Sequence, residues 1–130
     1  MKAIRLIALA ACMAATLDAS AQEQEIRLFS HRGGRMEHDE NTLSAFQASY
    51  DAGYRGFETD IRMTRDGALV ITHDSSLERT TDGTGTVEEK TEAEIRRLRT
   101  KQGNKVLFLD ELLEFLEGKE GLYVEFEMKT

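Results

Sequence analysis

The sequence predicts an α/β fold built around a parallel sheet. Short apolar segments with the composition of strands alternate with segments whose apolar residues recur at helical spacing. The resulting order is strand, helix, strand, helix, strand, which is typical of βαβ units and therefore of parallel strands. A closed eight-stranded βα barrel needs roughly 250 residues. The 130 residues of this sequence therefore accommodate at most about three βα units, the first part of such a barrel.

The first strand and helix are expected between residues 25 and 53. The segment EIRLFS, residues 25–30, alternates apolar and charged side chains and is followed by a glycine-rich polar loop. Leu43, Phe46 and Tyr50 then recur at helical spacing. Asn41 or Thr42 is the expected N-cap, and Gly53 is the expected end of this helix.

The second strand is expected at residues 55–61, and a turn of sequence RDG separates it from another short strand, ALVIT, at residues 68–72. A polar segment with two glycines follows. Thr91 and Glu94 form a T-x-x-E capping box that opens a short helix ending at Leu98. An amphipathic helix is expected at residues 109–118, and residues 122–129 have the composition of a strand.

The first 21 residues have the layout of a secretory signal peptide. Lys2 and Arg5 precede an apolar stretch at residues 6–17, and a small-residue cleavage site ends at Ala21. The apolar stretch is too short to span a membrane, so we expect no stable membrane insertion. Residues 22–130 would then be one exported domain, periplasmic or secreted. Lipid anchoring through Cys12 is the less favoured alternative, because cleavage there leaves a very short apolar segment.

The charge of the chain excludes some partners. Its 17 basic and 24 acidic residues give a formal net charge of −7, and removal of residues 1–21 makes it more negative. Such a surface repels nucleic acid and anionic membranes, so neither is an expected partner. Cys12 is the only cysteine, and the chain therefore has no intramolecular disulfide.

Pairs of acids mark two of the expected strands. Glu58 and Asp60 are two residues apart, so both carboxylates face the same side of a strand, and Glu125, Glu127 and Lys129 repeat this spacing. Two adjacent carboxylates in a partly buried site repel each other unless a cation lies between them. Oxygen ligands alone favour Ca²⁺ or Mg²⁺. The same spacing is equally common on solvent-exposed strands, so it also fits a solvated edge.

Two of the three histidines directly follow apolar strands. His31 follows residues 25–30 and His73 follows residues 68–72, and α/β folds build active sites at the carboxyl ends of their strands. Imidazole titrates near neutral pH, so two of them can divide acid and base roles. Either histidine taken alone also fits a structural, hydrogen-bonded role. His38, in a charged run, is expected to be a solvated loop residue.

Arg32 is a candidate for binding phosphate or carboxylate with two parallel hydrogen bonds. The alternative is an ion pair with Glu37 or Glu40. Gly33 and Gly34 would let the backbone approach a ligand closely, or would simply make the loop flexible.

Seven short motifs occur in one order along the chain. They are HRG at residues 31–33, ENT at 40–42, ETD at 58–60, TRDG at 64–67, HD at 73–74, LERTTDGTG at 77–85 and EMK at 127–129. In this order and near this spacing, they resemble the glycerophosphodiester phosphodiesterase family. No single motif is specific, but the whole series extends from residue 28 to residue 129.

The resemblance implies the N-terminal portion, about three βα units, of a (βα)8 TIM-type barrel that hydrolyses small-molecule glycerophosphodiesters to glycerol 3-phosphate and an alcohol. It implies one divalent cation, Ca²⁺ or Mg²⁺, among Glu58, Asp60 and Glu127. It implies His31 and His73 as the general acid–base pair and Arg32 and Lys129 as residues that bind the phosphodiester. The nucleophile, water or a hydroxyl of the glycerol, stays open.

The sequence also departs from the family. Asp39 and Ser75 stand where the family usually has proline, and Leu107-Phe108 replaces Pro-Thr, which removes a helix cap. We expect these changes to affect loop rigidity rather than chemistry. The alternatives are a related phospholipase-like or sphingomyelinase-D-like phosphodiesterase, or, if the 130 residues are complete, a non-catalytic metal-binding or assembly module. In that last case the final strand would be an unpaired edge with half of the barrel core facing water.

Overall fold

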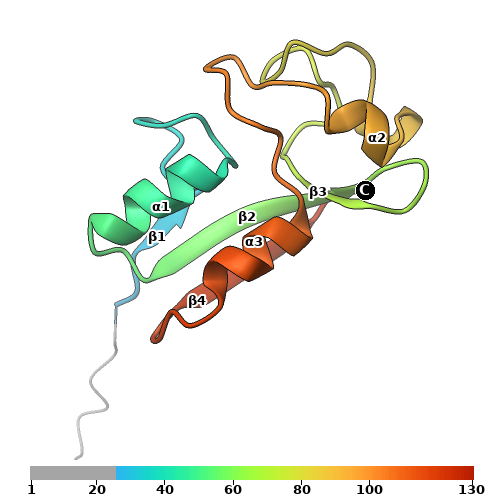
Figure 1. Cartoon of the computed structure of the whole chain (residues 1–130). Helices are drawn as coiled ribbons and strands as arrows, with labels where there is room; N and C mark the ends of the chain where they lie inside the picture. The colour runs from blue at the N-terminus through green and yellow to red at the C-terminus, as the bar shows by residue number, and fades with distance from the viewer. Residues whose placement is uncertain (1–25) are drawn as a thin grey trace, which may run out of the picture.

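The computed structural model describes residues 26–130 (Figure 1). The predicted signal peptide, residues 1–21, and Cys12 lie outside the described residues. The elements, in chain order, are β1 (Phe29–His31), α1 (Leu43–Asp51), β2 (Gly56–Met63), β3 (Leu69–Ile71), the 3-10 helix η1 (Val87–Glu89), α2 (Glu92–Ile95), α3 (Leu109–Leu116) and β4 (Tyr123–Met128). The predicted α/β class is confirmed.

Strand β2 is the centre of the sheet. Strands β1 and β4 pair with it in parallel, and β3 returns antiparallel along its last three residues. The backbone N–H groups of Arg32 and Thr72 donate to the carbonyls of Glu58 and Asp60, whereas that of Lys129 donates to Ile61. Alternate carbonyls of a strand point to opposite edges. Strand β3 therefore continues the edge occupied by β1, and β4 takes the other edge.

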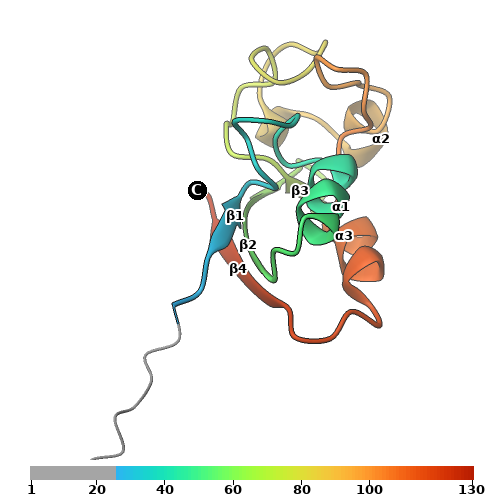
Figure 2. The ribbon, with the colours of Figure 1, turned by 90° about the vertical axis from the view of Figure 1, so that its left-hand side faces the viewer.

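The helices α1 and α3 cover one face of this sheet, as Figure 2 shows. Phe57 and Ile61 of β2 point toward them and form a buried core with Phe46 of α1 and Leu112 of α3. Because successive strand side chains point to opposite faces, the intervening acids of β2 point away from the helices. A second apolar cluster, around Ile95 of α2, lies beneath the long segment between β3 and α3.

Two helix caps follow the sequence prediction. Thr42 is the N-cap of α1, and its hydroxyl accepts a hydrogen bond from the N–H of Ala45 at 3.2 Å. Thr91 and Glu94 form the predicted capping box of α2, with bonds of 3.3 and 2.7 Å between each side chain and the other residue's N–H. Such caps contribute about 1 kcal/mol each.

Helix α3 has no side-chain hydrogen bond at its N-cap, because Phe108 occupies that position. The replacement of Pro-Thr by Leu107-Phe108 predicted this loss. The Glu111 carboxylate compensates in part, because it accepts a hydrogen bond from the N–H of Phe108 at 3.0 Å. The helix ends at Leu116, two residues before Gly118.

The limits of several elements differ from the sequence prediction, most clearly those of β1 and α2. Strand β1 begins at Phe29 and includes His31, because the strand extends only where β2 pairs with it, from Gly56 to Glu58. The helix predicted to reach Leu98 ends at Ile95. Both predictions erred at the ends of elements, where local sequence pattern is a weak guide.

Strand β4 forms an edge of the sheet among residues 26–130, since it pairs there with β2 alone. Its Phe126 and Met128 side chains are exposed. Within the same residues, no helix is long and apolar enough to cross a membrane.

Candidate active site

Four predicted site residues meet on the face of the sheet opposite the helices. The last residue of β1, His31, is in register with Glu58 of β2, and Asp60 of β2 is in register with Glu127 of β4. Carboxylate oxygens of Glu58, Asp60 and Glu127 lie within 4.8 Å of one another. The parallel strands therefore bring together three acids from two strands that are far apart in the sequence.

Asp60 is the buried centre of this acidic cluster. Its side chain is 1% exposed, and its Oδ2 lies 3.2 Å from Arg32 Nε and accepts a hydrogen bond from Asn41 Nδ2 at 3.1 Å. Its Oδ1 is also buried, accepts no hydrogen bond, and lies 3.2 Å from the ammonium of Lys129. A carboxylate removed from water requires positive charge and hydrogen bonds. Oδ1 is thus stabilised by the positive charge of Lys129 and by no hydrogen bond.

Glu58 connects the acidic cluster to the first histidine. Its Oε2 accepts a hydrogen bond from the N–H of Arg32 at 3.3 Å and lies 3.5 Å from His31 Nε2. Burial, reinforced by the negative charge of Asp60, raises the pKa of Glu58. Burial and a neighbouring carboxylate thus both disfavour the charged form of Glu58, and a bound cation would favour it.

Lys129 follows Glu127 at the end of β4 and turns back over the acids. Its Nζ lies 2.6 Å from Glu127 Oε1 and 3.2 Å from Asp60 Oδ1. Glu127, followed by Asp60, raises the pKa of Lys129, so its side chain is a cation at neutral pH. A divalent cation bound by these acids would share two of them with this ammonium.

Arg32 holds the acidic cluster from the β1 side. Its guanidinium is 9% exposed and contacts Glu40 at 3.3 Å as well as Asp60, so the predicted ion pair with Glu40 is present. Arg32 and Asn41 have φ values of 54° and 57°, in the left-handed region that residues other than glycine rarely adopt. These are the only two such residues between positions 26 and 130, and both contact Asp60. Backbone strain is thus concentrated around the buried carboxylate.

Gly33 has a packing role that the sequence did not predict. The two interpretations from the sequence were close approach to a ligand and loop flexibility. Its φ is 75°, and a Cβ added there would lie 2.9 Å from the Cβ of Ala45 in α1. Its carbonyl accepts a hydrogen bond from the Ser49 hydroxyl at 3.0 Å. Glycine at this position lets the loop that carries Arg32 lie directly against α1. His38, in the same loop, is exposed as predicted.

His73 lies beyond β3 and connects to the cluster through a series of charged side chains. Its Nδ1 is 2.7 Å from Asp74 Oδ1, and the other oxygen of Asp74 accepts a hydrogen bond from Arg79 Nε. The remaining nitrogens of Arg79 donate to Glu40 at 2.7 and 2.9 Å. Glu40 in turn contacts Arg32. We call His73, Asp74, Arg79 and Glu40 the His73 network.

The sequence alone predicted no site role for Asp74 and Arg79, and it predicted only a helix cap for Asn41 and an ion pair with Arg32 for Glu40. All four lie within quoted motifs, namely ENT, HD and LERTTDGTG, but their residue types did not indicate the contacts that they make in the site. Only the fold brings Glu40 and Arg79, 39 positions apart, into contact. The available signal was the position of each residue within a motif.

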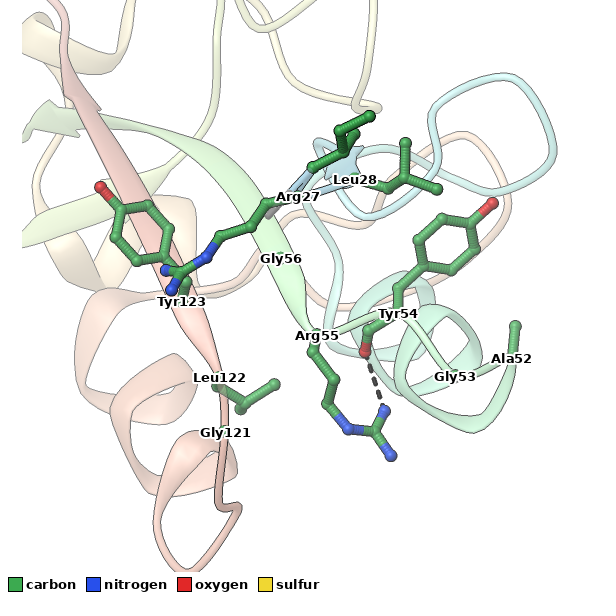
Figure 3. A pocket seen from close by; sticks show the side chains of 11 residues that line it. Arg27, Leu28, Ala52, Gly53, Tyr54, Arg55, Gly56, Gly121, Leu122 and Tyr123 are labelled. Carbon is green, nitrogen blue, oxygen red and sulfur yellow. Dashed lines mark hydrogen bonds between the residues drawn. The ribbon is translucent and has the colours of Figure 1, made fainter. Parts of the chain in front are cut away.

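A pocket of about 640 Å³ lies at the opposite end of the sheet. Figure 3 shows Leu28, Tyr54, Gly56 and Tyr123 around it, with the Arg27 side chain reaching across toward the Tyr123 ring. None of its lining residues is an acid or a histidine. The pocket and the acidic cluster are separate features.

Parallel strands that bring three acids and a histidine together on one face of the sheet define the chain as an α/β protein with a candidate cation site. The family model described as the glycerophosphoryl diester phosphodiesterase family matches residues 31–130. The chain belongs to this family. The seven motifs that suggested the resemblance are thus part of a match across most of the chain.

Individual relatives agree with the family match. The glycerophosphodiester phosphodiesterase of Caldanaerobacter subterraneus is 34% identical over 110 residues, which are 79% of this chain and 45% of that protein. The human glycerophosphodiester phosphodiesterase 1 is 44% identical over 73 residues, 56% of this chain and 22% of that protein. The chain spans less than half the length of these curated relatives.

Solved structures share the fold. The glycerophosphodiester phosphodiesterase of Agrobacterium tumefaciens superposes with a TM-score of 0.75 at 34% identity, over 82% of this chain and 48% of that one. A phosphodiesterase of Oleispira antarctica, solved with the product sn-glycerol-3-phosphate, gives a TM-score of 0.74 at 30% identity, over 80% of this chain and 44% of that one. The chain thus corresponds to part of the barrel of these proteins.

Proposed function

We propose that the chain forms the catalytic portion of a divalent-cation-dependent phosphodiesterase that hydrolyses glycerophosphodiesters to glycerol 3-phosphate and an alcohol. The observation that carries the proposal is the convergence of Glu58, Asp60 and Glu127, with His31 beside Glu58. The family match and the product bound to the Oleispira antarctica relative support the choice of substrate.

The acidic cluster fits a divalent cation. All three groups offer carboxylate oxygens, which suit Ca²⁺ or Mg²⁺, and Asp60 Oδ1 is buried without a hydrogen bond. A cation held there would draw electron density from a phosphoryl oxygen and favour attack on phosphorus. Arg32 and Lys129 already contact Asp60, so they place positive charge where the phosphodiester would develop negative charge.

Two histidines with different surroundings suit general acid–base catalysis. The His31 ring is half exposed and lies beside Glu58, whereas the His73 ring is held through Nδ1 by Asp74. Holding Nδ1 leaves Nε2 of His73 as the nitrogen that exchanges a proton with substrate. We assign one histidine to activation of the nucleophile and the other to protonation of the leaving alkoxide.

The predicted export of the protein and the assignment of its domain are proposals as well. We propose that residues 1–21 direct export and that residues 22–130 form the N-terminal part of the phosphodiesterase domain. A cleavage after Ala21, detected by mass spectrometry of the protein isolated from its source, would support this assignment. An intact N-terminus, or a lipid on Cys12, would contradict it.

The test compares three histidine variants. We expect His31→Ala and His73→Ala to lower kcat for glycerophosphocholine by about 100- to 10,000-fold, the usual contribution of a positioned acid or base. His38→Ala changes an exposed histidine of the loop that follows His31, so it is the matched control and should retain full activity. Turnover is measured after chelation and re-addition of Ca²⁺ or Mg²⁺, with calorimetry reporting whether each variant still binds the ion.

Two results would contradict the proposal. One is hydrolysis that does not depend on either ion, and the other is a pair of histidine variants as active as His38→Ala. Preference for an intact phospholipid over glycerophosphocholine would instead favour the phospholipase-like alternative.

A further inference from the structure

The surroundings of His73 contain more charge than one histidine needs to be held in place. Asp74 contacts the ring, and Arg79 joins Asp74 to Glu40, which also contacts Arg32. The series therefore runs from an imidazole to the buried aspartate of the acidic cluster through alternating negative and positive groups. Every contact in it is a charge-assisted hydrogen bond or an ion pair, the stronger class of polar interaction.

Arg79 is the residue on which this series depends. Its Nε faces Asp74, and its two terminal nitrogens donate to the two oxygens of Glu40 at 2.7 and 2.9 Å. The planar guanidinium has its donors in fixed directions, so it sets the angle between the two carboxylates. Lysine carries the same charge without that geometry.

Arg79 also sets the state of Asp74. The guanidinium, with a smaller effect of the His73 ring, lowers the pKa of Asp74 to about 2. Asp74 is therefore a carboxylate throughout the neutral range, and it accepts the proton on Nδ1 of His73. The ring is thus held with Nδ1 protonated and with Nε2 free to accept a proton.

A second support holds the backbone of the same segment. Arg62 Nε donates to the carbonyl of His73 at 2.9 Å, and its Nη1 contacts Glu88 at 2.8 Å. Glu88 also accepts a hydrogen bond from Ser75 at 2.6 Å. The backbone position of His73 is thus fixed independently of Arg79, which leaves ring orientation and tautomer as the properties that Arg79 controls.

We propose that Arg79 is a positioning residue that couples the ring of His73 to the Arg32 side of the acidic cluster. This role rests on the proposed function, since a particular tautomer of His73 matters only if His73 transfers a proton. Arg79 contacts neither the predicted cation ligands nor the predicted substrate-binding residues, and it acts through Asp74 and Glu40.

The experiment uses Arg79→Gln, Arg79→Lys and the control Arg97→Gln, which removes an exposed arginine outside the network. We expect Arg79→Gln to lower kcat for glycerophosphocholine about 10- to 100-fold, the range for loss of a hydrogen-bonded partner behind a functional side chain. KM and the affinity for Ca²⁺ should stay within about twofold, because uniform binding is unchanged. Arg79→Lys should restore only part of the loss.

A second readout reports the ring directly and needs no turnover. Nitrogen chemical shifts of His73, assigned by comparison with His73→Ala, should show the tautomer protonated at Nδ1 in the wild-type protein and a mixture in Arg79→Gln. If Arg79→Gln fails to fold, the same comparison with Arg79→Lys decides. A wild-type tautomer ratio and kcat in the Arg79 variants would overturn the proposal. A wild-type protein with no turnover would instead overturn the proposed function while leaving the tautomer measurement valid.

Discussion

The two ends of the β1–β2–β4 sheet have opposite characters. At the carboxyl end, the acidic cluster and the His73 network form a nearly continuous series of ion pairs around the buried Asp60. At the amino end, a pocket of about 640 Å³ is lined mainly by apolar, aromatic and glycine residues and holds no acid. There Ile26 and Leu28 are 84% and 69% exposed.

Cavity size therefore does not point to the candidate site in this chain. The default expectation places a ligand in a well-formed apolar pocket, but no acid or histidine lines the amino-end pocket. The carboxyl end has such residues because loops leaving parallel strands converge there. His31 and Glu127 lie at or near the ends of β1 and β4, and the register places them beside Glu58 and Asp60 within β2.

The largest expected difference between the two ends comes from Asp60→Asn. This change leaves Arg32 and Lys129 beside a neutral group, and losing one partner of a buried ion pair costs about 3–5 kcal/mol of unfolding free energy. Loss of an outer partner alone weakens metal sites about 10- to 100-fold, so we expect loss of this ligand to weaken Ca²⁺ binding by more than about 100-fold. Chemical denaturation and calorimetry measure the two effects.

The matched control for Asp60→Asn is Glu114→Gln, an exposed acid on α3. It should leave both stability and ion affinity unchanged. Equal ion affinity in Asp60→Asn and Glu114→Gln would remove the distinction between the two ends of the sheet.

Two glycine substitutions, one at each end, give an intermediate effect. A Cβ at Gly56 would lie 2.5 Å from the carbonyl oxygen of Leu28, and one at Gly33 would lie 2.9 Å from Ala45 Cβ. Overpacking of this kind costs about 1–3 kcal/mol, so thermal unfolding should show both Gly56→Ala and Gly33→Ala to be destabilised. Only Gly33→Ala should also weaken ion binding, because Gly33 adjoins Arg32. An ion affinity lowered equally by both variants would show that the ends are not independent.

The sequence predicted the contents of the site better than its geometry. The period-two spacing of Glu58 and Asp60 indicated their shared face, and the family resemblance implied that Glu127 would join them. The buried unbonded oxygen of Asp60 and the position of Lys129 between two acids depend on how the strands stack in register. No local pattern encodes that register.

The parts of the fold that were not predicted also depend on tertiary contacts. β1 is limited to three residues by its pairing with β2, although residues 25–30 have strand composition. Arg79 lies in a polar segment without periodicity, and its contact with Glu40 arises only when that segment folds over the sheet. Local composition reports propensity, while these contacts are set by tertiary packing.

The smallest expected effect concerns acid stability at the carboxyl end. The pKa of Asp74 is lowered to about 2 in the folded protein, chiefly by Arg79, whereas an aspartate in the unfolded chain titrates near 3.9. A carboxyl group whose pKa is lower in the folded than in the unfolded protein stabilises the fold at pH values above its unfolded pKa. This contribution disappears as the pH falls from about 4 toward 2. Asp74→Asn removes the titration, so the unfolding free energy of this variant should fall less steeply than that of the wild type over this interval.

Because Asp74 is partly exposed, solvent screening keeps the difference between the two proteins small. Denaturation at pH 5, 4, 3 and 2 measures it, and parallel curves for the two proteins would mean that Arg79 does not hold Asp74 as a carboxylate.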